Sequence, residues 1–344
     1  MTTLVGHILK RIFPISATAF EQMAGERYGF QEDMGRIWQG FLPVAETLVG
    51  GFHAAIGDGR LHVLVPRLNA IAPEFRGIAY EGAGMGLTLL DALFPWQNRL
   101  HTFLAGAGAR YTDLIYIGAG LVLPRLRKHP ESFVAQLDPI TGWLVVDGYG
   151  FYEGFFSGSR YVEDKEIPVH LSPYARRVFD QGLGRSIWFS TGANPDRIHT
   201  TIEAFPVGRR ADIWSGIGLA CAYAAGVVDH NAIQKLQMLA GAYQPQLALG
   251  AAIGARFRLQ SGHKAAHTEL ACELLWGLPS DTVAHMTDLA MQELPIADKE
   301  PLYDMWRKRI ETQFMERTVS VCMEKELQHD RVRNASQTTF RDTV

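Results

Sequence analysis

The stretch DGYGFYEGFF, residues 147–156, combines side chains that could do chemistry with glycines that weaken a helix. Its two carboxylates, Asp147 and Glu153, lie among two tyrosines and three phenylalanines. A carboxylate buried among aromatic rings must be paired or have a raised pKa, and a carboxylic acid that is neutral near pH 7 can donate a proton. The stretch therefore predicts either acid–base catalysis on an apolar substrate or a structural ion pair.

The glycine pattern of this stretch recurs along the chain. Copies of G-x-G followed by apolar residues are spaced 30–36 residues apart, with their first glycines at Gly82, Gly118, Gly148, Gly182 and Gly216 and weaker copies at Gly50 and Gly250. A period near 34 residues is typical of helical hairpins, and apolar residues after the glycines recur at the spacing of one helix face. Paired glycines let neighbouring backbones approach closely. We therefore predict an all-α fold of tandem hairpins of about 34 residues, forming an open superhelix or a closed α/α ring.

The rest of the chain fits a single domain over residues 1–330. Shorter helices are expected between the copies, for example over 194–205 and 229–243. The hairpins span roughly 50–262, amphipathic helices over 263–330 form a C-terminal cap, and the polar tail 331–344 is expected to be flexible. The segment before residue 16 has its basic residues after its apolar ones, which favours a short amphipathic helix over a signal peptide.

Aligned positions within the copies single out candidate catalytic residues. The residues directly before the first glycines are mostly polar and all differ: Glu81, Ile117, Asp147, Gln181, Ser215 and Leu249. In stacked hairpins such positions face the same surface, which indicates a ligand surface or the lumen of a ring, although helix capping would also use these residue types. Five positions past the first glycine, Glu153 is a single acid in an otherwise apolar series, and Arg185, Arg209 or Arg210 could neutralise it.

Further acids and the aromatic residues complete the candidate site. Asp180 and Asp212 precede their copies beside arginines, so a structural ion pair is favoured over catalysis, and Asp91 could be another buried acid. Aromatic faces could stabilise a carbocation on a folded polyene, with ordinary core packing as the alternative. The candidate substrate-binding residues are Tyr149, Phe151, Tyr152, Phe155, Arg185, Trp188, Trp214 and Tyr223.

Several functional classes lack their sequence signals. The net charge is −3, and no run of Lys or Arg forms a nucleic-acid-binding stripe. GAGMG resembles a dinucleotide loop but follows no convincing strand, and no flavin, haem or nicotinamide motif, GxSxG elbow or DDxxD-type metal motif occurs. HKAAH at 263–267 places two histidines four residues apart without a third ligand. We therefore expect no cofactor and no metal.

The protein is expected in the cytoplasm. Three cysteines without CxxC spacing argue against a disulfide framework. The longest apolar run, at 216–228, is shorter than the roughly 20 residues of a membrane-spanning helix.

The blocks RGIAYEGAGMGLTLLDALFP, LDPITGWLVVDGYGFYEGFF, RRVFDQGLGRSIWF and FPVGRRADIWSGIGLACAYAAG carry a family resemblance. Over about residues 40–290 the chain resembles the bacterial family known as domain of unknown function 1702. The resemblance implies an association with specialised-metabolite gene clusters of the enediyne-polyketide type, and so a hydrophobic polyene or isoprenoid substrate. It implies no catalytic residue.

Two functions are consistent with these patterns. The first is a cyclase or isomerase that folds a long apolar substrate in an aromatic cavity, with Asp147 and Glu153 as proton donor and acceptor. The second is a non-catalytic carrier or scaffold for a hydrophobic biosynthetic intermediate, acting with partner enzymes or as a homo-oligomer.

Overall fold

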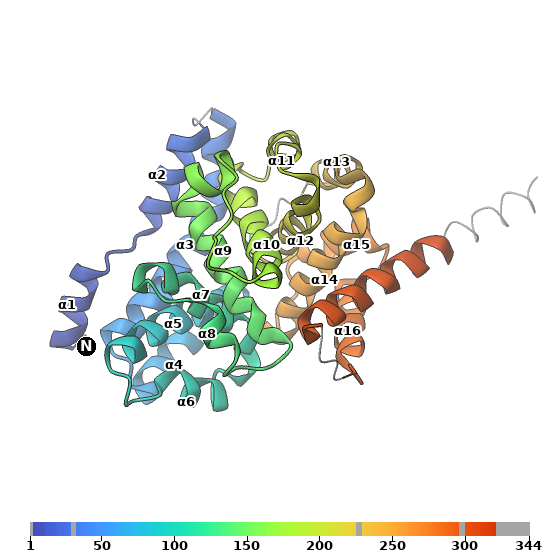
Figure 1. The fold of residues 1–344 in the computed structure, drawn as a ribbon. Coiled ribbons are helices and arrows are strands. Elements are labelled where there is room, and N and C mark those ends of the chain that lie inside the picture. Colours follow the sequence, from blue (N-terminus) through green and yellow to red (C-terminus); the bar gives the residue numbers. More distant parts are fainter. Residues whose placement is uncertain (1–2, 29–31, 225–228, 296–299, 321–344) are drawn as a thin grey trace, which may run out of the picture.

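The computed structural model describes residues 3–28, 32–224, 229–295 and 300–320 (Figure 1). Every regular element in these ranges is helical and none is a strand, which confirms the all-α prediction. The main helices are α1 (Leu4–Ile12), α2 (Ala17–Tyr28), α3 (Glu32–Gly57), α4 (Leu61–Asn69), α5 (Pro73–Leu93), α6 (Arg99–Ala105), α7 (Thr112–Leu126), α8 (Glu131–Val134), α9 (Leu144–Phe156), α10 (Pro173–Ser190), α11 (Pro195–Glu203), α12 (Val207–Tyr223), α13 (His230–Ala240), α14 (Gln244–Ser261), α15 (Ala266–Trp276), α16 (Ser280–Met291) and a last helix over 302–320.

Local sequence signals explain where many of these helices begin and end. Ser172 and Asn194 accept hydrogen bonds from backbone N–H groups in the first turns of α10 and α11, and proline opens both helices. Proline suits the first helical position because its missing N–H group would have no partner there. Gly262 ends α14 with a left-handed φ of 73°, a conformation that glycine adopts without strain.

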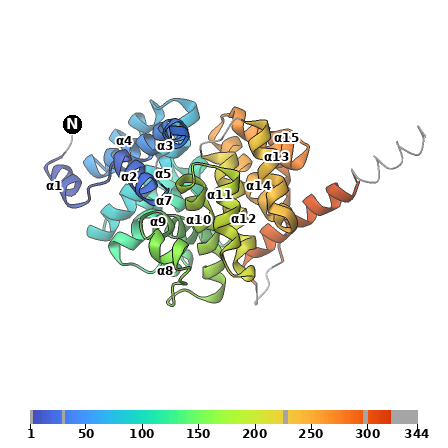
Figure 2. The same ribbon diagram turned by 90° about the horizontal axis from the view of Figure 1, so that it is seen from above.

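The long helices pack in chain order. Each of α3, α5, α7, α9, α10, α12 and α14 contacts the next, and α14 also contacts α5 and α16. Shorter helices lie between them in sequence, and the helices predicted over 194–205 and 229–243 are confirmed as α11 and α13. Figures 1 and 2 show the chain progressing across the molecule, with α1 at one end and the helix over 302–320 at the other.

The paired glycines lie where these long helices touch. A methyl group on Gly118 would overlap the Glu81 carbonyl oxygen of the preceding helix, and one on Gly120 would overlap the Val145 carbonyl oxygen of the following helix. The same arrangement repeats at the pairs beginning with Gly82, Gly148, Gly182 and Gly216. The prediction that these glycines permit close backbone approach is confirmed.

The two ends of this series differ from its middle, and Gly50 is not the repeat glycine that its spacing predicts. Gly50 is exposed and has open space where a side chain would lie, whereas Gly51 packs against the Ala79 carbonyl of α5. Gly51 therefore corresponds to the second glycine of the other pairs, and Val49, two residues earlier, occupies the place of the first glycine. In α14, Gly250 packs against Ser215, and the second position is Ala252. Thus α3 has only the glycine that contacts the following long helix, and α14 has only the glycine that contacts the preceding one.

The remaining expectations concern the chain's ends and its cysteines. The helix predicted before residue 16 is confirmed as α1, whereas the predicted tail 331–344 and Cys322 lie outside the described residues. Cys221 and Cys272 are free and buried. Among the described residues, no helix is both long and apolar enough to cross a membrane.

Candidate functional site

A buried polar cluster lies where α5, α9, α10 and the helix over 302–320 meet. We call Glu81, Asp147, Gln181, Arg185 and Tyr303 the interior cluster. The Asp147 carboxylate is fully buried and pairs with the Arg185 guanidinium, and it accepts a hydrogen bond of 2.8 Å from the Gln181 amide. Arg185 Nη2 lies 3.8 Å from Glu81 Oε1, and the Gln181 amide donates to the Tyr303 hydroxyl at 2.9 Å. One guanidinium thus serves two acids.

Several buried polar atoms beside this cluster have no hydrogen-bond partner within the described structure. They are Arg185 Nε, Ser215 Oγ and Tyr223 OH. Unsatisfied polar groups cost free energy when they are buried, so native proteins keep few of them. The interior therefore has spare hydrogen-bonding capacity beside its acids.

Burial, opposed by Arg185 and reinforced by Asp147, raises the pKa of Glu81 to about 7 from an ordinary value of 4.5. Because the folded state then binds this proton more tightly, the gain in stability is complete below pH 4.5 and is lost as the pH rises through 7. From the size of this shift we expect the free energy of unfolding of wild type, relative to Glu81→Gln, to fall by about 3 kcal/mol from pH 4 to 8.

Urea unfolding of both proteins across this pH range would measure the difference. Asp180, whose pKa is raised by burial to about 6, titrates in both proteins and cancels in the comparison. Parallel pH profiles for the two proteins would contradict the raised pKa of Glu81.

Glu153 lies in different surroundings from Asp147. It is half-buried, unlike the fully buried apolar residues at its aligned positions. Burial raises the pKa of Glu153, and Ser157, Arg160 and Tyr149 oppose this rise. Arg185, Arg209 and Arg210, which could have neutralised Glu153, pair instead with Asp147, Asp180 and Glu203. Six residues along a helix span about 600°, so the two acids of α9 face different neighbours.

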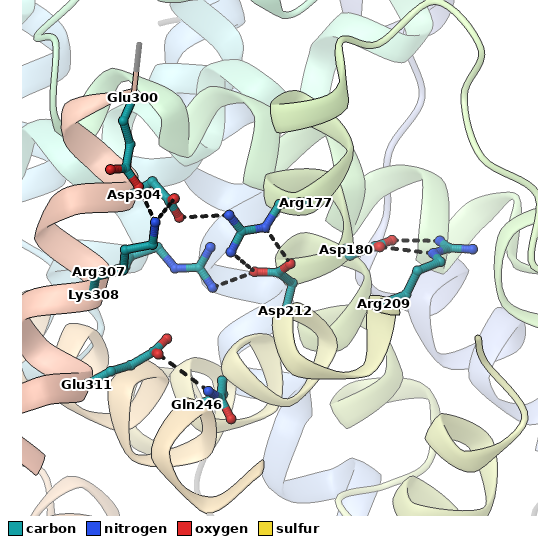
Figure 3. A network of polar contacts seen from close by, with 10 residues as sticks. All are labelled: Arg177, Asp180, Arg209, Asp212, Gln246, Glu300, Asp304, Arg307, Lys308 and Glu311. Atoms are coloured by element: carbon teal, nitrogen blue, oxygen red, sulfur yellow. Dashed lines mark hydrogen bonds and ion pairs between the residues drawn. The ribbon is translucent and has the colours of Figure 1, made fainter. Parts of the chain in front are cut away.

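Asp180 and Asp212 lie in ion pairs (Figure 3). Asp180 accepts hydrogen bonds from Arg209 Nη2 and Nε, at 2.6 and 2.9 Å. Asp212 accepts from Arg177 at 3.0 Å and from the fully buried Arg307 at 2.8 Å. These pairs connect α10 and α12, and Arg307 joins them to the helix over 302–320.

Asp91 is not the buried acid that its apolar neighbours predict. Its side chain is partly exposed and accepts hydrogen bonds from the backbone N–H groups of Arg99 and Leu100, where α6 begins. A carboxylate in this position satisfies free N–H groups and complements the helix dipole. Asp91 therefore caps a helix.

The candidate substrate-binding aromatics are mostly committed to the chain itself. The Arg185 guanidinium carbon lies 5.1 Å from the centre of the Phe151 ring, and Arg258 lies 5.0 Å from that of Tyr223. Trp188 and Trp214 are each 1% exposed, and Tyr149 contacts His170. The rings that were expected to face a carbocation thus already face arginines or the core.

An apolar pocket lies beside these residues, between the N-terminal segment and four long helices. We call it the N-terminal pocket; its volume is about 200 Å³. It is lined by Pro14, Ile15, Ala19, Phe20, Leu48, Val49, Phe52, Met85, Leu121, Arg125, Tyr152 and Phe156. Tyr152 is the predicted substrate-binding residue that lines it, and Phe155 packs against its Phe20 wall with ring centres 5.2 Å apart.

Arg125 is the charged residue among those lining the N-terminal pocket. Its guanidinium donates to the Pro14 carbonyl oxygen at 3.1 Å and lies 5.5 Å from the centre of the Phe13 ring. These contacts hold the N-terminal segment over the pocket and leave donors for an acidic or polar group, because a guanidinium has five N–H bonds. The pocket thus combines apolar walls with a cation.

The aligned positions could have revealed part of this arrangement. One aligned series consists of the residues three positions after the first glycine of each copy, or after Val49 in α3. Its members are Phe52, Met85, Leu121, Phe151, Arg185, Leu219 and Ile253. The first three line the N-terminal pocket, and the next two belong to or contact the interior cluster. Arg185 is the single charge in this series, which is the same signal that singled out Glu153.

A metal site at HKAAH has no support in the geometry. The buried His267 ring contacts Arg258 and the Tyr223 carbonyl, and burial lowers the pKa of His267 to about 4. No group of three or more His, Cys, Asp or Glu side chains within the described residues could hold a metal ion.

Comparison with known proteins gives a family and no closer relative. A family model described as "Protein of unknown function (DUF1702)" matches residues 5–314. No curated protein and no solved structure is significantly similar to the chain.

Proposed function

The chain belongs to the family described as protein of unknown function (DUF1702), and we propose that it is a carrier for a hydrophobic polyene or isoprenoid intermediate of specialised metabolism. The observation that carries this proposal is the N-terminal pocket, with apolar walls and one guanidinium. Its volume of about 200 Å³ is below the roughly 300–1,000 Å³ of sites for drug-sized ligands, so it suits a slender chain.

The carrier proposal fits the placement of the acids better than a cyclase does. Neither Asp147 nor Glu153 lines the N-terminal pocket, and the two acids have separate partners. Phe151 and Tyr223 stack with arginines, which leaves those ring faces unavailable to a substrate cation. A carrier needs the pocket alone, and the interior acids then have a structural role.

The architecture proposed with this function is a series of tandem hairpins that turns back on itself. The ordered contacts from α3 to α14 and the contact of α14 with α5 support a superhelix that nearly closes. The helix over 302–320 is proposed as its cap, attached through Arg307 and Tyr303.

We expect the tetraene cis-parinaric acid to fluoresce more strongly on binding the pocket. Leu121→Phe fills the pocket and should weaken binding at least about tenfold, because the ligand and the added ring compete for one space. Fluorescence titration measures both affinities. Met238→Phe, on the exposed face of α13, is the matched control and should bind as wild type does. Equal binding by Leu121→Phe, or none by wild type, would contradict the proposal.

Arg125 is expected to select ligands with an acidic group. Arg125→Gln should weaken binding of cis-parinaric acid about tenfold, because a hydrogen bond to a charged group contributes about 1.5–3 kcal/mol. The methyl ester of cis-parinaric acid should bind wild type and Arg125→Gln equally. A parallel loss for acid and ester would indicate that Arg125 only holds the N-terminal segment in place.

Acid–base catalysis in the interior cluster is a second candidate, which the raised pKa of Glu81 favours together with the unpartnered Tyr223 hydroxyl. A panel of long polyenes and prenyl substrates tests it by mass spectrometry of the products. Turnover by wild type that disappears in Glu81→Gln or Asp147→Asn would establish an enzyme. If wild type and both variants leave every substrate unchanged, the carrier function remains as the proposal.

A further inference from the structure

Helix α1 presents an apolar face to solvent. Leu4, Ile8 and Ile12, spaced four residues apart on one side of the helix, are 78%, 50% and 60% exposed, and Val5 beside them is 48% exposed. An apolar face this continuous is unusual on a short surface helix, which ordinarily buries its apolar stripe. The face therefore calls for a partner outside the fold.

The fold holds this face outward. Thr3 donates to the Gly57 carbonyl from its backbone N–H at 2.9 Å and from its hydroxyl at 3.0 Å, while Gly6 packs on Gly57 and Leu9 is buried. The opposite side of α1 is thus fixed to the end of α3. Figures 1 and 2 both place α1 at the outer edge of the molecule.

The charge around this face is positive. Arg11, in the last turn of α1, lies beside this face, and Lys10 lies on the side toward α3. Residues 1–20 contain no Asp or Glu, although the whole chain has a net charge of −3. Basic residues beside an apolar helix face are typical of helices that lie on anionic lipid. A second copy of this chain would bring like charges together at the same face.

A tryptophan extends the apolar surface beyond α1. Trp96 is 72% exposed and lines the same groove as Val5. Tryptophan is enriched where proteins meet the membrane interface, because its large ring is apolar and its N–H group can remain hydrated. Leu4, Val5, Ile8, Ile12 and Trp96 together form what we call the N-terminal face.

We infer that the N-terminal face docks on an anionic lipid surface, with α1 lying in the membrane plane. Arg11, beside the apolar face, contacts lipid phosphates and carboxylates, and the apolar side chains enter the boundary between headgroups and acyl chains. The residues that follow α1, including Pro14 and Ile15, line the N-terminal pocket. Docking therefore brings this part of the pocket's lining close to the membrane, although membrane binding does not depend on the pocket's ligand.

Sedimentation of the full chain with vesicles tests this docking. We expect binding to an equal mixture of phosphatidylserine and phosphatidylcholine, and much weaker binding to phosphatidylcholine alone. Leu4→Asn with Ile8→Asn should reduce binding roughly tenfold or more, because two exposed apolar side chains no longer enter the lipid. Arg11→Gln should weaken binding to the anionic vesicles about fivefold, at about 1 kcal/mol per charge.

The variants are all at exposed or partly exposed positions, and circular dichroism checks that they fold. Met238→Asn, a 71% exposed position on α13, is the matched control and should bind as wild type does. No sedimentation of folded wild type with anionic vesicles would overturn the inference, as would unchanged binding by the Leu4/Ile8 variant. A wild-type dimer that the Leu4/Ile8 variant abolishes would assign this face to a second copy instead.

Discussion

Asp147→Ala is expected to lower the free energy of unfolding by about 3–5 kcal/mol, because it leaves the Arg185 guanidinium buried without its main partner. Arg185 is 3% exposed, and its remaining acid, Glu81, lies 3.8 Å away with a raised pKa of about 7. Urea unfolding followed by helical circular dichroism measures the loss. The effect should be large because a buried guanidinium that loses its charged partner keeps its desolvation cost.

A double variant separates the cost of an unpaired charge from the value of the pair. Asp147→Leu with Arg185→Met removes both charges and keeps apolar volume, so it should recover most of the stability that Asp147→Ala loses. If Asp147→Ala is as stable as wild type, the Asp147 carboxylate is not needed to stabilise the buried charge of Arg185. If the double variant is the least stable of the three, the pair itself is net stabilising.

Gly216→Ala is expected to destabilise the protein by about 3 kcal/mol, at the upper end of the range for overpacking. The added methyl group would overlap the Gln181 carbonyl oxygen and crowd the Arg185 backbone nitrogen, so α10 and α12 would have to separate. Thermal or urea unfolding measures this loss. The displacement would extend along both helices, because a helix backbone cannot move aside locally as a flexible side chain can.

Gly50→Ala is the matched control with the opposite sign. Gly50 is also inside a helix but has open space around it, so alanine should stabilise the protein by about 0.5–1 kcal/mol through helix propensity alone. Equal effects at Gly50 and Gly216 would show that propensity, and not helix contact, determines both.

The repeated glycines made the helical architecture predictable from sequence. Because each pair lies at a contact between consecutive helices, its period reports the spacing of the helices, and α11 and α13 follow between the copies. The same regularity misled at Gly50, where Gly51 is the residue at the contact. A spacing of 30–36 residues is too irregular to fix a register to one residue.

The candidate site was less predictable because its contacts join distant segments. Asp147 and Arg185 lie in neighbouring copies of the repeat. An alignment of the copies could show that each differs from the other residues at its own position, but it could not show that the two side chains pair. The N-terminal pocket joins Ile15 to Arg125 and Tyr152, and no periodic signal relates these positions. Glu153 appeared equivalent to buried leucines, yet the end of α9 leaves it half-buried beside Ser157.

The asymmetry of the glycines at the two ends makes the array self-limiting. A helix can approach closely from the front of α3 but not from behind it, since Val49 occupies the place of the first glycine. At α14 the second place is taken by Ala252, and a copy of α3 arriving there would meet its methyl group together with the Val49 side chain. The close backbone contact that joins consecutive helices inside the molecule is therefore not repeated at either end of the series, which disfavours growth into a filament through that contact.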